Sequence, residues 1–230
     1  MRRTHRGLTD LTLERELLAS GIESVIGMDE VGRGCIAGPV GAGAARFDLP
    51  TLLAGEAPES RIPAGLDDSK KLSATARTSM VEAIAGWNPH TAVAFAQPAE
   101  IDALGISLAL CLAGRRALSQ LAPADLVLLD GSFDWLSQNL TLDAAAVFGP
   151  SAEVPVPPVR TFVKGDGTYV TIAAASVVAK VARDELMHAL AVDFPGYGWE
   201  SNAGYPSPAH KAAVAQLGIT SHHRRSFKLR

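Results

Sequence analysis

Apolar and polar residues follow two different periods along the chain. Short apolar runs that end at polar or glycine residues are typical of buried strands, and they cover residues 24–28, 40–47, 91–97 and 126–129. Longer stretches with apolar residues at helical spacing predict helices over residues 8–19, 73–85, 98–121, 168–191 and 208–217. Because strands and helices alternate along the chain, the pattern predicts an α/β fold with helices on both faces of a sheet.

Turn and capping residues mark several boundaries of these elements. Ser73 is a suitable N-cap for the helix that follows it, and Gly218 ends the last helix. Residues 155–163 contain three prolines, which suits an extended segment at an edge of the sheet. Residues 48–65 are rich in Pro, Gly and Glu, so we expect a surface loop there.

Length and composition indicate one cytoplasmic domain. A chain of 230 residues most often forms a single domain, and we expect an α/β core at about 20–190 followed by a helical, basic part at about 191–230. No segment reaches the ~18 apolar residues of a membrane span, and the basic N-terminus lacks the apolar core of a secretion signal. Cys35 and Cys111 lack a CxxC motif and are expected to be reduced core residues.

The distribution of basic residues leaves nucleic acid open as a partner. The net charge of −3 argues against a histone-like polycation. A nucleic-acid enzyme needs a basic stripe rather than a basic average. The basic residues are clustered at Arg2, Arg3 and Arg6, at Lys70 and Lys71, and at Arg224, Arg225, Lys228 and Arg230.

Two adjacent acids follow the first predicted strand. Asp29 and Glu30 come directly after residues 24–28, and a Gly32-Arg33-Gly34 turn follows. Neighbouring residues on a strand point to opposite faces, so both acids share a site only if the strand ends at residue 28 and the backbone bends. Glycines permit such a bend and let backbone amides approach a ligand closely.

Two further acids lie where an α/β sheet places its sites. Asp130 ends the strand at residues 126–129, and Asp166 precedes the helix at 168–191. Taken alone, Asp130 also suits a turn and Asp166 a helix cap. Four acids meeting at one edge would repel each other unless a cation neutralised them. Magnesium prefers oxygen ligands, and two such ions about 4 Å apart can clamp a phosphodiester displacement.

Other common catalytic motifs are missing from the sequence. No set of Cys and His has the spacing of a zinc site, and no GxxxxGK[ST] phosphate loop or GxSxG nucleophile elbow occurs. The acids are therefore the leading candidates for chemistry.

Taken together, these residues resemble ribonuclease HII, the bacterial type 2 ribonuclease H. The resemblance rests on blocks that occur in family order over about 200 residues: Asp29-Glu30-Val31-Gly32-Arg33-Gly34, Ala37-Gly38-Pro39-Val40, Asp68-Ser69-Lys70-Lys71-Leu72-Ser73, Asp130-Gly131, Lys164-Gly165-Asp166, residues 172–184, Gly204-Tyr205, His210, and His223-Arg224-Arg225-Ser226-Phe227. It implies an RNase H-like fold, with a mixed central β-sheet flanked by helices and a helical C-terminal portion. It also implies an endoribonuclease that cleaves the RNA strand of RNA–DNA hybrids and incises duplex DNA 5′ to single ribonucleotides.

The same resemblance assigns roles to residues. It implies that Asp29, Glu30, Asp130 and Asp166 hold two Mg²⁺ or Mn²⁺ ions, and that the products carry 5′-phosphate and 3′-hydroxyl ends. The Gly32-Arg33-Gly34 turn would read the ribose 2′-hydroxyl, which distinguishes RNA from DNA. Tyr205 would stack at the ribonucleotide–deoxyribonucleotide junction. Where the family usually has Gly-Tyr-Gly-Thr, this chain has Gly-Tyr-Pro-Ser, so Pro206 is expected to affect that loop.

Several basic and polar residues are candidate contacts to the nucleic acid. Lys70, Lys71 and Lys164 are expected to contact phosphates. Ser176, Lys180 and Asp184 share one helical face with Arg183 beside them, which is either a phosphate-docking face or a solvated face with a Lys180–Asp184 pair. In either case Asp184 is expected to be structural. His223, Arg224 and Arg225 either grip the DNA backbone or form a solvated tail, whereas Trp87, Trp135 and Trp199 are expected to pack in the interior.

Two other functions compete with this hypothesis. The first is another metal-dependent nuclease of the same fold, such as a junction resolvase or an exonuclease, which would also cut an all-DNA substrate. The second is a non-catalytic hybrid-binding module, which would bind without turnover. We expect a monomer, because nothing in the sequence indicates a second large apolar face.

Overall fold

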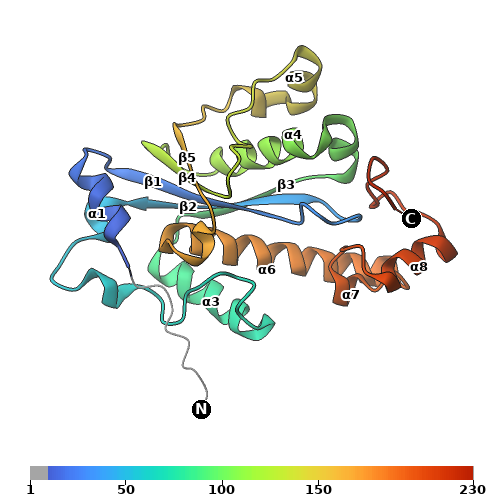
Figure 1. The fold of residues 1–230 in the computed structure, drawn as a ribbon, viewed down its shortest axis with the longest axis horizontal. Helices are drawn as coiled ribbons and strands as arrows, with labels where there is room; N and C mark the ends of the chain where they lie inside the picture. Colours follow the sequence, from blue (N-terminus) through green and yellow to red (C-terminus); the bar gives the residue numbers. More distant parts are fainter. Residues whose placement is uncertain (1–9, 230) are drawn as a thin grey trace.

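A mixed sheet of five strands forms the centre of the computed structural model, which describes residues 10–229 (Figure 1). The strand order is β3-β2-β1-β4-β5. The strands are β1 (Ser24–Val31), β2 (Val40–Asp48), β3 (Thr91–Ala96), β4 (Leu126–Asp130) and β5 (Val159–Phe162). The β1–β2 and β2–β3 pairs are antiparallel, whereas β1–β4 and β4–β5 are parallel. The strand predictions are confirmed, and the three prolines lie just before edge strand β5.

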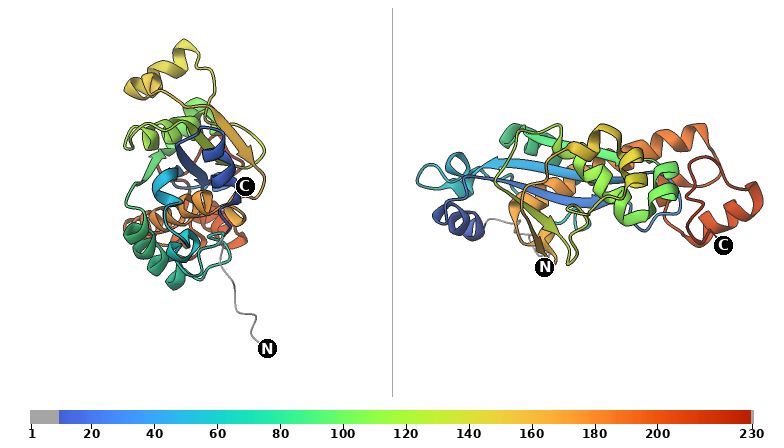
Figure 2. Two further views of the ribbon diagram at one scale, coloured as in Figure 1. Left: turned by 90° about the vertical axis from the view of Figure 1, so that its left-hand side faces the viewer. Right: turned by 90° about the horizontal axis from the view of Figure 1, so that it is seen from above.

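Helices cover both faces of the sheet, which confirms the predicted fold class. Figures 1 and 2 show α4 (Pro98–Leu118) and α5 (Leu142–Phe148) on one face, with α1 (Thr12–Ala19), α3 (Ala74–Trp87) and α6 (Val170–Asp193) on the other. The short helices α7 (Trp199–Asn202) and α8 (Pro208–Leu217) lie at the far end of α6. None of the helices in residues 10–229 combines the length and the hydropathy that a bilayer span requires.

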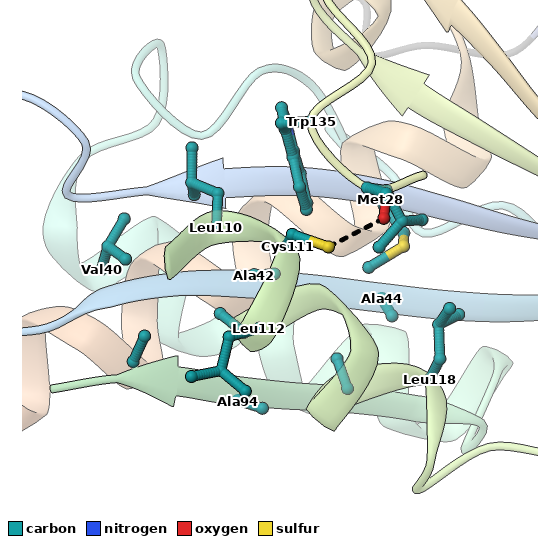
Figure 3. Close-up of a cluster of buried hydrophobic side chains, with 14 of the residues drawn as sticks. Met28, Val40, Ala42, Ala44, Ala94, Leu110, Cys111, Leu112, Leu118 and Trp135 are labelled. Atoms are coloured by element: carbon teal, nitrogen blue, oxygen red, sulfur yellow. Dashed lines mark hydrogen bonds between the residues drawn. The ribbon is translucent and has the colours of Figure 1, made fainter. Parts of the chain in front are cut away.

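The core between α4 and the sheet consists of tightly packed apolar side chains (Figure 3). Small residues of β2, including Ala42 and Ala44, leave room for α4 to approach, and Trp135 closes the cluster from the loop after β4. The Cys111 thiol lies in this cluster and donates to the Leu136 carbonyl at 3.0 Å. Both cysteines are buried and form no disulfide, as the sequence predicts.

On the opposite face, two glycines bring α6 unusually close to the sheet. A Cβ at Gly27 of β1 would lie 2.2 Å from the Thr171 carbonyl oxygen, and one at Gly43 of β2 would lie 2.4 Å from the Ala175 carbonyl oxygen. Real Cβ atoms do not approach so closely, so only glycine fits at these two positions. This contact sets how near α6 and the turn before it come to the ends of β1 and β4.

A third apolar cluster attaches the C-terminal part. Met187 of α6 packs with Tyr197, Trp199 and Val214, and Ala37 from the β1–β2 connection joins them. Helix α6 runs to Asp193, across the boundary expected at about residue 190, so a single helix contributes to both parts.

Some local predictions differ from the structure. Strand β1 continues past residue 28 to Val31, because Asp29 and Glu30 keep regular pairing with β2. Residues 48–65 are not only the surface loop that was expected, because they contain helix α2 (Leu49–Leu52) and the 3₁₀ turn η1 (Pro58–Arg61). Leu49 of α2 and Pro58 of η1 are buried. Helix α4 is interrupted at Gly105, whose φ of 73° and ψ of 163° are not helical. Four short elements were not predicted from the sequence: α5, α7 and the 3₁₀ turns η2 (Gly149–Glu153) and η3 (Gly165–Gly167). Residues 8 and 9 of the predicted first helix lie outside the described residues.

Helix α1 carries a buried carboxylate. Glu14 is 0% exposed, and its Oε1 accepts a 3.4 Å hydrogen bond from Thr171 Oγ1 of α6. Among residues 10–229, Oε2 has no hydrogen-bond partner. Burial is the largest cause that raises the pKa of Glu14 from 4.5 to about 7.

We expect Glu14→Gln to change the pH dependence of stability. Because the pKa of Glu14 is higher in the folded state, its protonated form contributes to the free energy of unfolding. This contribution to stability is complete below pH 4.5 and is lost as the pH rises through about 7. Glutamine cannot ionise, so the free energy of unfolding of the variant should rise relative to wild type by up to about 3 kcal/mol between pH 5 and pH 8. Urea titrations at both pH values measure this difference. The exposed Glu16→Gln on the same helix is the control, and equal pH dependence in wild type and Glu14→Gln would contradict the expectation.

Candidate metal and nucleic-acid site

Three aspartates meet at the end of the two central parallel strands. Residues 25 and 27 of β1 and residues 126 and 128 of β4 face α6, so the alternation of side chains places Asp29 and Asp130 on that face too. The register pairs Met28 with Leu129, which makes Asp29 and Asp130 neighbours one residue further along. Asp166 comes from turn η3, just before α6. One carboxylate oxygen from each of the three lies within 4.8 Å of the others.

Backbone hydrogen bonds fix Asp130 against the turn that carries Asp166. Asp130 Oδ1 accepts from the backbone N–H of Gly165 at 2.7 Å and of Asp166 at 3.3 Å. The turn is tight, because a Cβ at Gly165 would lie 2.6 Å from Ile172 Cδ1. Lys164, which precedes it, has a left-handed φ of 59°, a conformation that costs a non-glycine residue energy.

The protein environment opposes ionisation of these acids. Burial, followed by the charges of Asp130 and Glu30, raises the pKa of Asp29 from 3.8 to about 8, against a hydrogen bond from Ser176. Burial and the charge of Asp166 also raise the pKa of Asp130. A cation at the cluster would remove this penalty.

Lys70 supplies a cation beside the cluster. Its Nζ donates to Asp166 Oδ2 at 3.0 Å and lies 3.9 Å from Asp68 Oδ1, although the side chain is largely exposed. Partial burial lowers the pKa of the amine, but the hydrogen bond and charge of Asp166 outweigh this effect, so the pKa of Lys70 is raised. Lys70 therefore offsets part of the negative charge of the site.

Glu30 does not lie with the three aspartates. Because β1 stays regular through Val31, Glu30 points away from the face that Asp29 occupies, which corrects the expectation that the strand ends before the two acids. Its Oε1 lies 3.6 Å from Arg33 Nη1. Glu30 nevertheless lines the same pocket as Asp29 and Asp130.

That pocket joins most of the residues that the sequence singled out. It has a volume of about 230 Å³. Its lining includes Asp29, Glu30, Gly32, Arg33, Gly34, Ser69, Lys70, Asp130, Ser176, Lys180 and Tyr205. Acids, the glycine turn and the tyrosine thus share one concave surface, although they lie far apart in the sequence.

Two buried arginines hold the glycine turn from behind. Arg224 donates to the carbonyls of Gly32 at 2.7 Å, Arg33 at 3.1 Å, Gly38 at 2.9 Å and Pro39 at 3.1 Å. Arg183 donates to the carbonyls of Pro39, Ala203 and Ala37. Both side chains are 0% exposed, so the expectation that Arg224 grips the DNA backbone is wrong, and its role is structural.

The role of Arg183 could not be predicted from the sequence. The pattern placed Arg183 only beside a possible phosphate-docking face, and helical spacing does put the residue one turn beyond Lys180. A Cβ at Gly32, whose φ is 77°, would lie 2.1 Å from Arg183 Nε. The arginine therefore fills the space behind the turn, and nothing in the sequence identifies the carbonyls that it binds.

The face of α6 around Lys180 contains the Lys180–Asp184 pair that the sequence offered as one alternative, and it also borders the pocket. Ser176 Oγ and Ser69 Oγ form a buried hydrogen bond of 3.0 Å, and both residues line the pocket. Lys180 Nζ donates to Asp184 Oδ2 at 2.7 Å, and Arg77 Nη2 lies 3.5 Å from that same oxygen. Asp184 thus has the ion-pair role that the sequence predicts, while Lys180 also reaches the pocket lining.

The remaining basic candidates lie at different depths. A second hollow beside Asp130 and Asp166 is lined by Lys70, Lys71 and Lys164. Lys71 Nζ donates to Asp67 Oδ1 at 2.7 Å.

In the C-terminal basic cluster, Arg225 is exposed, and its backbone N–H donates to Asp102 Oδ2 at 3.0 Å. His223 is buried, so neither of the two alternatives for it, a DNA contact or a solvated tail, is correct. Arg2, Arg3, Arg6 and Arg230 lie outside the described residues.

Two of the three tryptophans are buried as expected, and Trp87 is half-buried against Phe47. Trp135 and Trp199 are buried, and Trp87 packs on Phe47 with ring centroids 5.0 Å apart. They are therefore not available as base-stacking residues in the pocket.

Tyr205 keeps its place in the pocket despite the proline that follows it. Its side chain is 44% exposed. The Ser207 N–H donates to the Tyr205 carbonyl at 2.8 Å, which closes a three-residue turn centred on Pro206. The fixed φ of proline suits the centre of such a turn. Pro206 therefore constrains the loop without removing the tyrosine ring from the pocket.

The donor set suits a hard divalent cation. All three aspartates offer carboxylate oxygens, which Mg²⁺ and Mn²⁺ prefer over nitrogen or sulfur. Burial and the neighbouring acids raise the pKa values of Asp29 and Asp130, so a bound cation would favour the ionised carboxylates that serve as ligands.

Comparison with known proteins places these features in one family. The family model described as Ribonuclease HII matches residues 26–230. A ribonuclease HII from Ruegeria pomeroyi is 45% identical over 226 residues, which cover 97% of this chain and 85% of that protein. A ribonuclease HII from Streptomyces avermitilis is 43% identical over 218 residues, covering 94% of this chain and 82% of that protein.

Solved structures share the fold at lower identity. Ribonuclease H2 from Pyrococcus horikoshii superposes with a TM-score of 0.65 at 24% identity, covering 90% of this chain and 94% of that one. Bst-RNase HIII in complex with Mn²⁺ gives a TM-score of 0.66 at 22% identity, covering 90% of this chain and 67% of that one.

Proposed function

The chain belongs to the ribonuclease HII family and is an endonuclease that cleaves the RNA strand of RNA–DNA hybrids; on this basis we propose that it also incises duplex DNA on the 5′ side of single ribonucleotides. The observation that carries this proposal is the pocket shared by three of the acids (Asp29, Glu30 and Asp130), the 32–34 turn and Tyr205. Recognition of one ribose requires a sensor for its 2′-hydroxyl next to the group that cuts the adjacent phosphodiester.

The acids have the roles of metal ligands in this proposal. Asp29, Asp130 and Asp166 hold two Mg²⁺ or Mn²⁺ ions, and Glu30 at the pocket rim completes the ligand set. When bound, the ions activate the attacking water and stabilise the leaving 3′-oxygen, which leaves 5′-phosphate and 3′-hydroxyl ends. The contribution of the protein is to hold the carboxylates in place, through the β1–β4 register and the backbone hydrogen bonds to Asp130.

Lys70 has two partners in this mechanism. Without metal its amine binds Asp166 at 3.0 Å and reduces the repulsion within the cluster. A cation held by the aspartates would take over that task and would leave the exposed Lys70 side chain free to contact a substrate phosphate. Lys71, Lys164, Lys180 and Arg225 are further phosphate contacts in this proposal, and Ser176 and Arg33 contact the substrate from the pocket wall.

The proposed 2′-hydroxyl sensor makes different demands on its two glycines. Gly32 has a left-handed φ of 77° and no room for a Cβ against Arg183. Gly34 has room, because the nearest atom to a Cβ there is Tyr205 Cε1 at 4.0 Å. A methyl group at Gly34 would thus occupy the space between the turn and Tyr205, where the ribose is expected to bind.

We expect Gly34→Ala to lower incision at a single ribonucleotide without loss of stability. The methyl group should keep the ribose from the backbone amides and lower kcat/KM by about 10- to 100-fold. The free energy of unfolding should change by less than about 0.5 kcal/mol. Gly32→Ala is the matched comparison, because its methyl group clashes with the protein itself and should destabilise the fold. Normal incision by a stable Gly34→Ala variant would contradict the proposed ribose contact.

A substrate comparison tests the proposed function. The protein is incubated with Mg²⁺ and one of three labelled duplexes: an RNA–DNA hybrid, a DNA duplex with one ribonucleotide, or an all-DNA duplex. The proposal predicts cleavage of the first two only, with 3′-hydroxyl ends. Cleavage of the all-DNA duplex would favour the alternative nuclease class, and binding without any cleavage would favour a hybrid-binding module. Cleavage of the hybrid alone would refute the junction role of Tyr205.

A further inference from the structure

A chain of hydrogen bonds behind the pocket ends on the backbone of Tyr205. The Tyr205 carbonyl lies 2.8 Å from His210 Nδ1. His210 Nε2 in turn lies 3.0 Å from Trp199 Nε1 and 3.3 Å from His223 Nε2. The other nitrogen of His223, Nδ1, lies 3.0 Å from the backbone nitrogen of Thr220. The imidazoles of His210 and His223 are both buried.

The groups at the ends of this chain determine where the protons lie. A backbone N–H can only donate, so His223 Nδ1 accepts from Thr220 and the neutral ring carries its proton on Nε2. An indole N–H also only donates, so His210 Nε2 accepts from Trp199. The proton of His210 must then be on Nδ1, where it donates to the Tyr205 carbonyl. Burial lowers the pKa of both imidazoles, that of His223 to about 4, which is consistent with two neutral rings.

The segment that carries His223 also holds the glycine turn. Next to His223, the Arg224 backbone N–H donates to the Ile36 carbonyl at 2.9 Å, and the Gly38 N–H donates to the His222 carbonyl at 2.8 Å. The buried Arg224 guanidinium binds the Gly32 carbonyl at 2.7 Å. His223 therefore connects through His210 to Tyr205, and its neighbour Arg224 connects to the 32–34 turn. These two adjacent residues thus support both halves of the proposed ribose site.

The backbone before Tyr205 needs such support. Ala203 has a left-handed φ of 46°, and Gly204 follows with a φ of 83°. Arg183 Nη1 donates to the Ala203 carbonyl at 2.8 Å, and the Ile36 N–H donates to the Gly204 carbonyl at 2.9 Å. With the His210 bond to the Tyr205 carbonyl, three successive carbonyls are held by groups outside the loop. A strained backbone persists when its surroundings determine it in this way.

We propose that His210 is a positioning residue for Tyr205, and that His223 and Arg224 fix it relative to the 32–34 turn. The His210 Nδ1–H bond sets the orientation of the Tyr205 peptide and hence the direction in which the ring enters the pocket. The inference deepens the proposed function and rests on it, since the ring position matters only if Tyr205 contacts the junction. His210 does not touch the substrate in this arrangement.

Two isosteric variants of His210 separate positioning from packing. The side-chain amide of asparagine can place its NH₂ group where His210 has Nδ1, whereas glutamine places its amide near the position of Nε2. His210→Asn therefore keeps a donor for the Tyr205 carbonyl, and His210→Gln loses it while keeping a polar group toward Trp199. Both remove part of the ring, so both should destabilise the fold to a similar degree.

The readout is the ratio of kcat/KM for a single-ribonucleotide duplex to kcat/KM for a long RNA–DNA hybrid. We expect His210→Gln to lower this ratio by about 10- to 100-fold and His210→Asn to lower it less than about threefold. Equal ratios for wild type, Asn and Gln variants would overturn the positioning role. A wild-type protein that does not cut the single-ribonucleotide duplex would instead refute the proposed function, so the two failures are distinguishable.

A spectroscopic measurement checks the same assignment without activity. Nitrogen-15 NMR of the histidine rings should show His210 as the Nδ1–H form and His223 as the Nε2–H form at neutral pH. The opposite form of His210 would place a lone pair against the Tyr205 carbonyl and would overturn the proposal.

Discussion

Replacing Asp29 by Asn is expected to abolish cleavage while stabilising the metal-free protein. Asparagine is a weaker ligand for a hard cation, so kcat should fall by at least about 10³-fold, equivalent to roughly 4 kcal/mol of lost transition-state stabilisation. The buried Asp29 has a pKa raised from 3.8 to about 8, so the stability of the metal-free fold falls as the pH rises between these two values and is constant above them. A neutral amide removes that cost and should raise the free energy of unfolding at pH 9 by roughly 1–4 kcal/mol.

Thermal unfolding with and without Mn²⁺ measures both effects. Added Mn²⁺ should raise the unfolding temperature of wild type, because it binds the folded state, and should raise that of Asp29→Asn much less. Asp193→Asn is the control, since this acid is exposed at the end of α6 and away from the pocket. A variant that is destabilised without metal and still responds fully to Mn²⁺ would show that Asp29 is not a ligand.

Gly27→Ala is expected to be the most damaging small substitution in the fold. Its Cβ would lie 2.2 Å from the Thr171 carbonyl oxygen, and this atom belongs to the backbone of α6 and cannot rotate away. The helix must therefore move, at a cost of about 3 kcal/mol or more. Asp166 lies just before α6 and Ser176 on it, so the same movement should lower kcat/KM of the folded variant by about 100-fold.

A second glycine provides the matched control for this prediction. No atom lies within 4 Å of a Cβ at Gly86 in α3, so Gly86→Ala should stabilise the protein by up to about 1 kcal/mol through helix propensity. Urea unfolding compares the two variants, and a kinetic assay on the folded fraction reports the site. An unfolding midpoint for Gly27→Ala equal to that of wild type would mean that α6 does not depend on this contact.

The sequence predicted the sheet because its strands are short apolar runs with clear ends. Asp29, Asp130 and Asp166, which the sequence placed at strand ends and a turn, lie close together in the structure. Glu30 does not join the three aspartates, because β1 keeps pairing with β2 beyond the apolar run. Such pairing between strands is not visible in the sequence of one strand. Helix α4 is also interrupted at Gly105, within a stretch that the apolar pattern predicts as one helix.

The roles of the buried polar residues could not be predicted from the sequence. Arginines in basic clusters are usually exposed, yet Arg224 is buried because four carbonyls of the β1–β2 connection accept its hydrogen bonds, those of Gly32, Arg33, Gly38 and Pro39. His210 and His223 lie 13 positions apart and meet only through the fold. Such partners are non-local, so a pattern of residue types identifies the positions but not the bonds.

The most direct test of the central claim uses a labelled DNA duplex that contains one ribonucleotide. Wild type and Asp130→Asn are compared with Mg²⁺ and with a chelator. The account predicts a single cut on the 5′ side of the ribonucleotide by wild type with Mg²⁺, and no cut by the variant or with the chelator. Equal cutting by Asp130→Asn, or cutting by wild type in the presence of the chelator, would contradict a metal site built on these carboxylates.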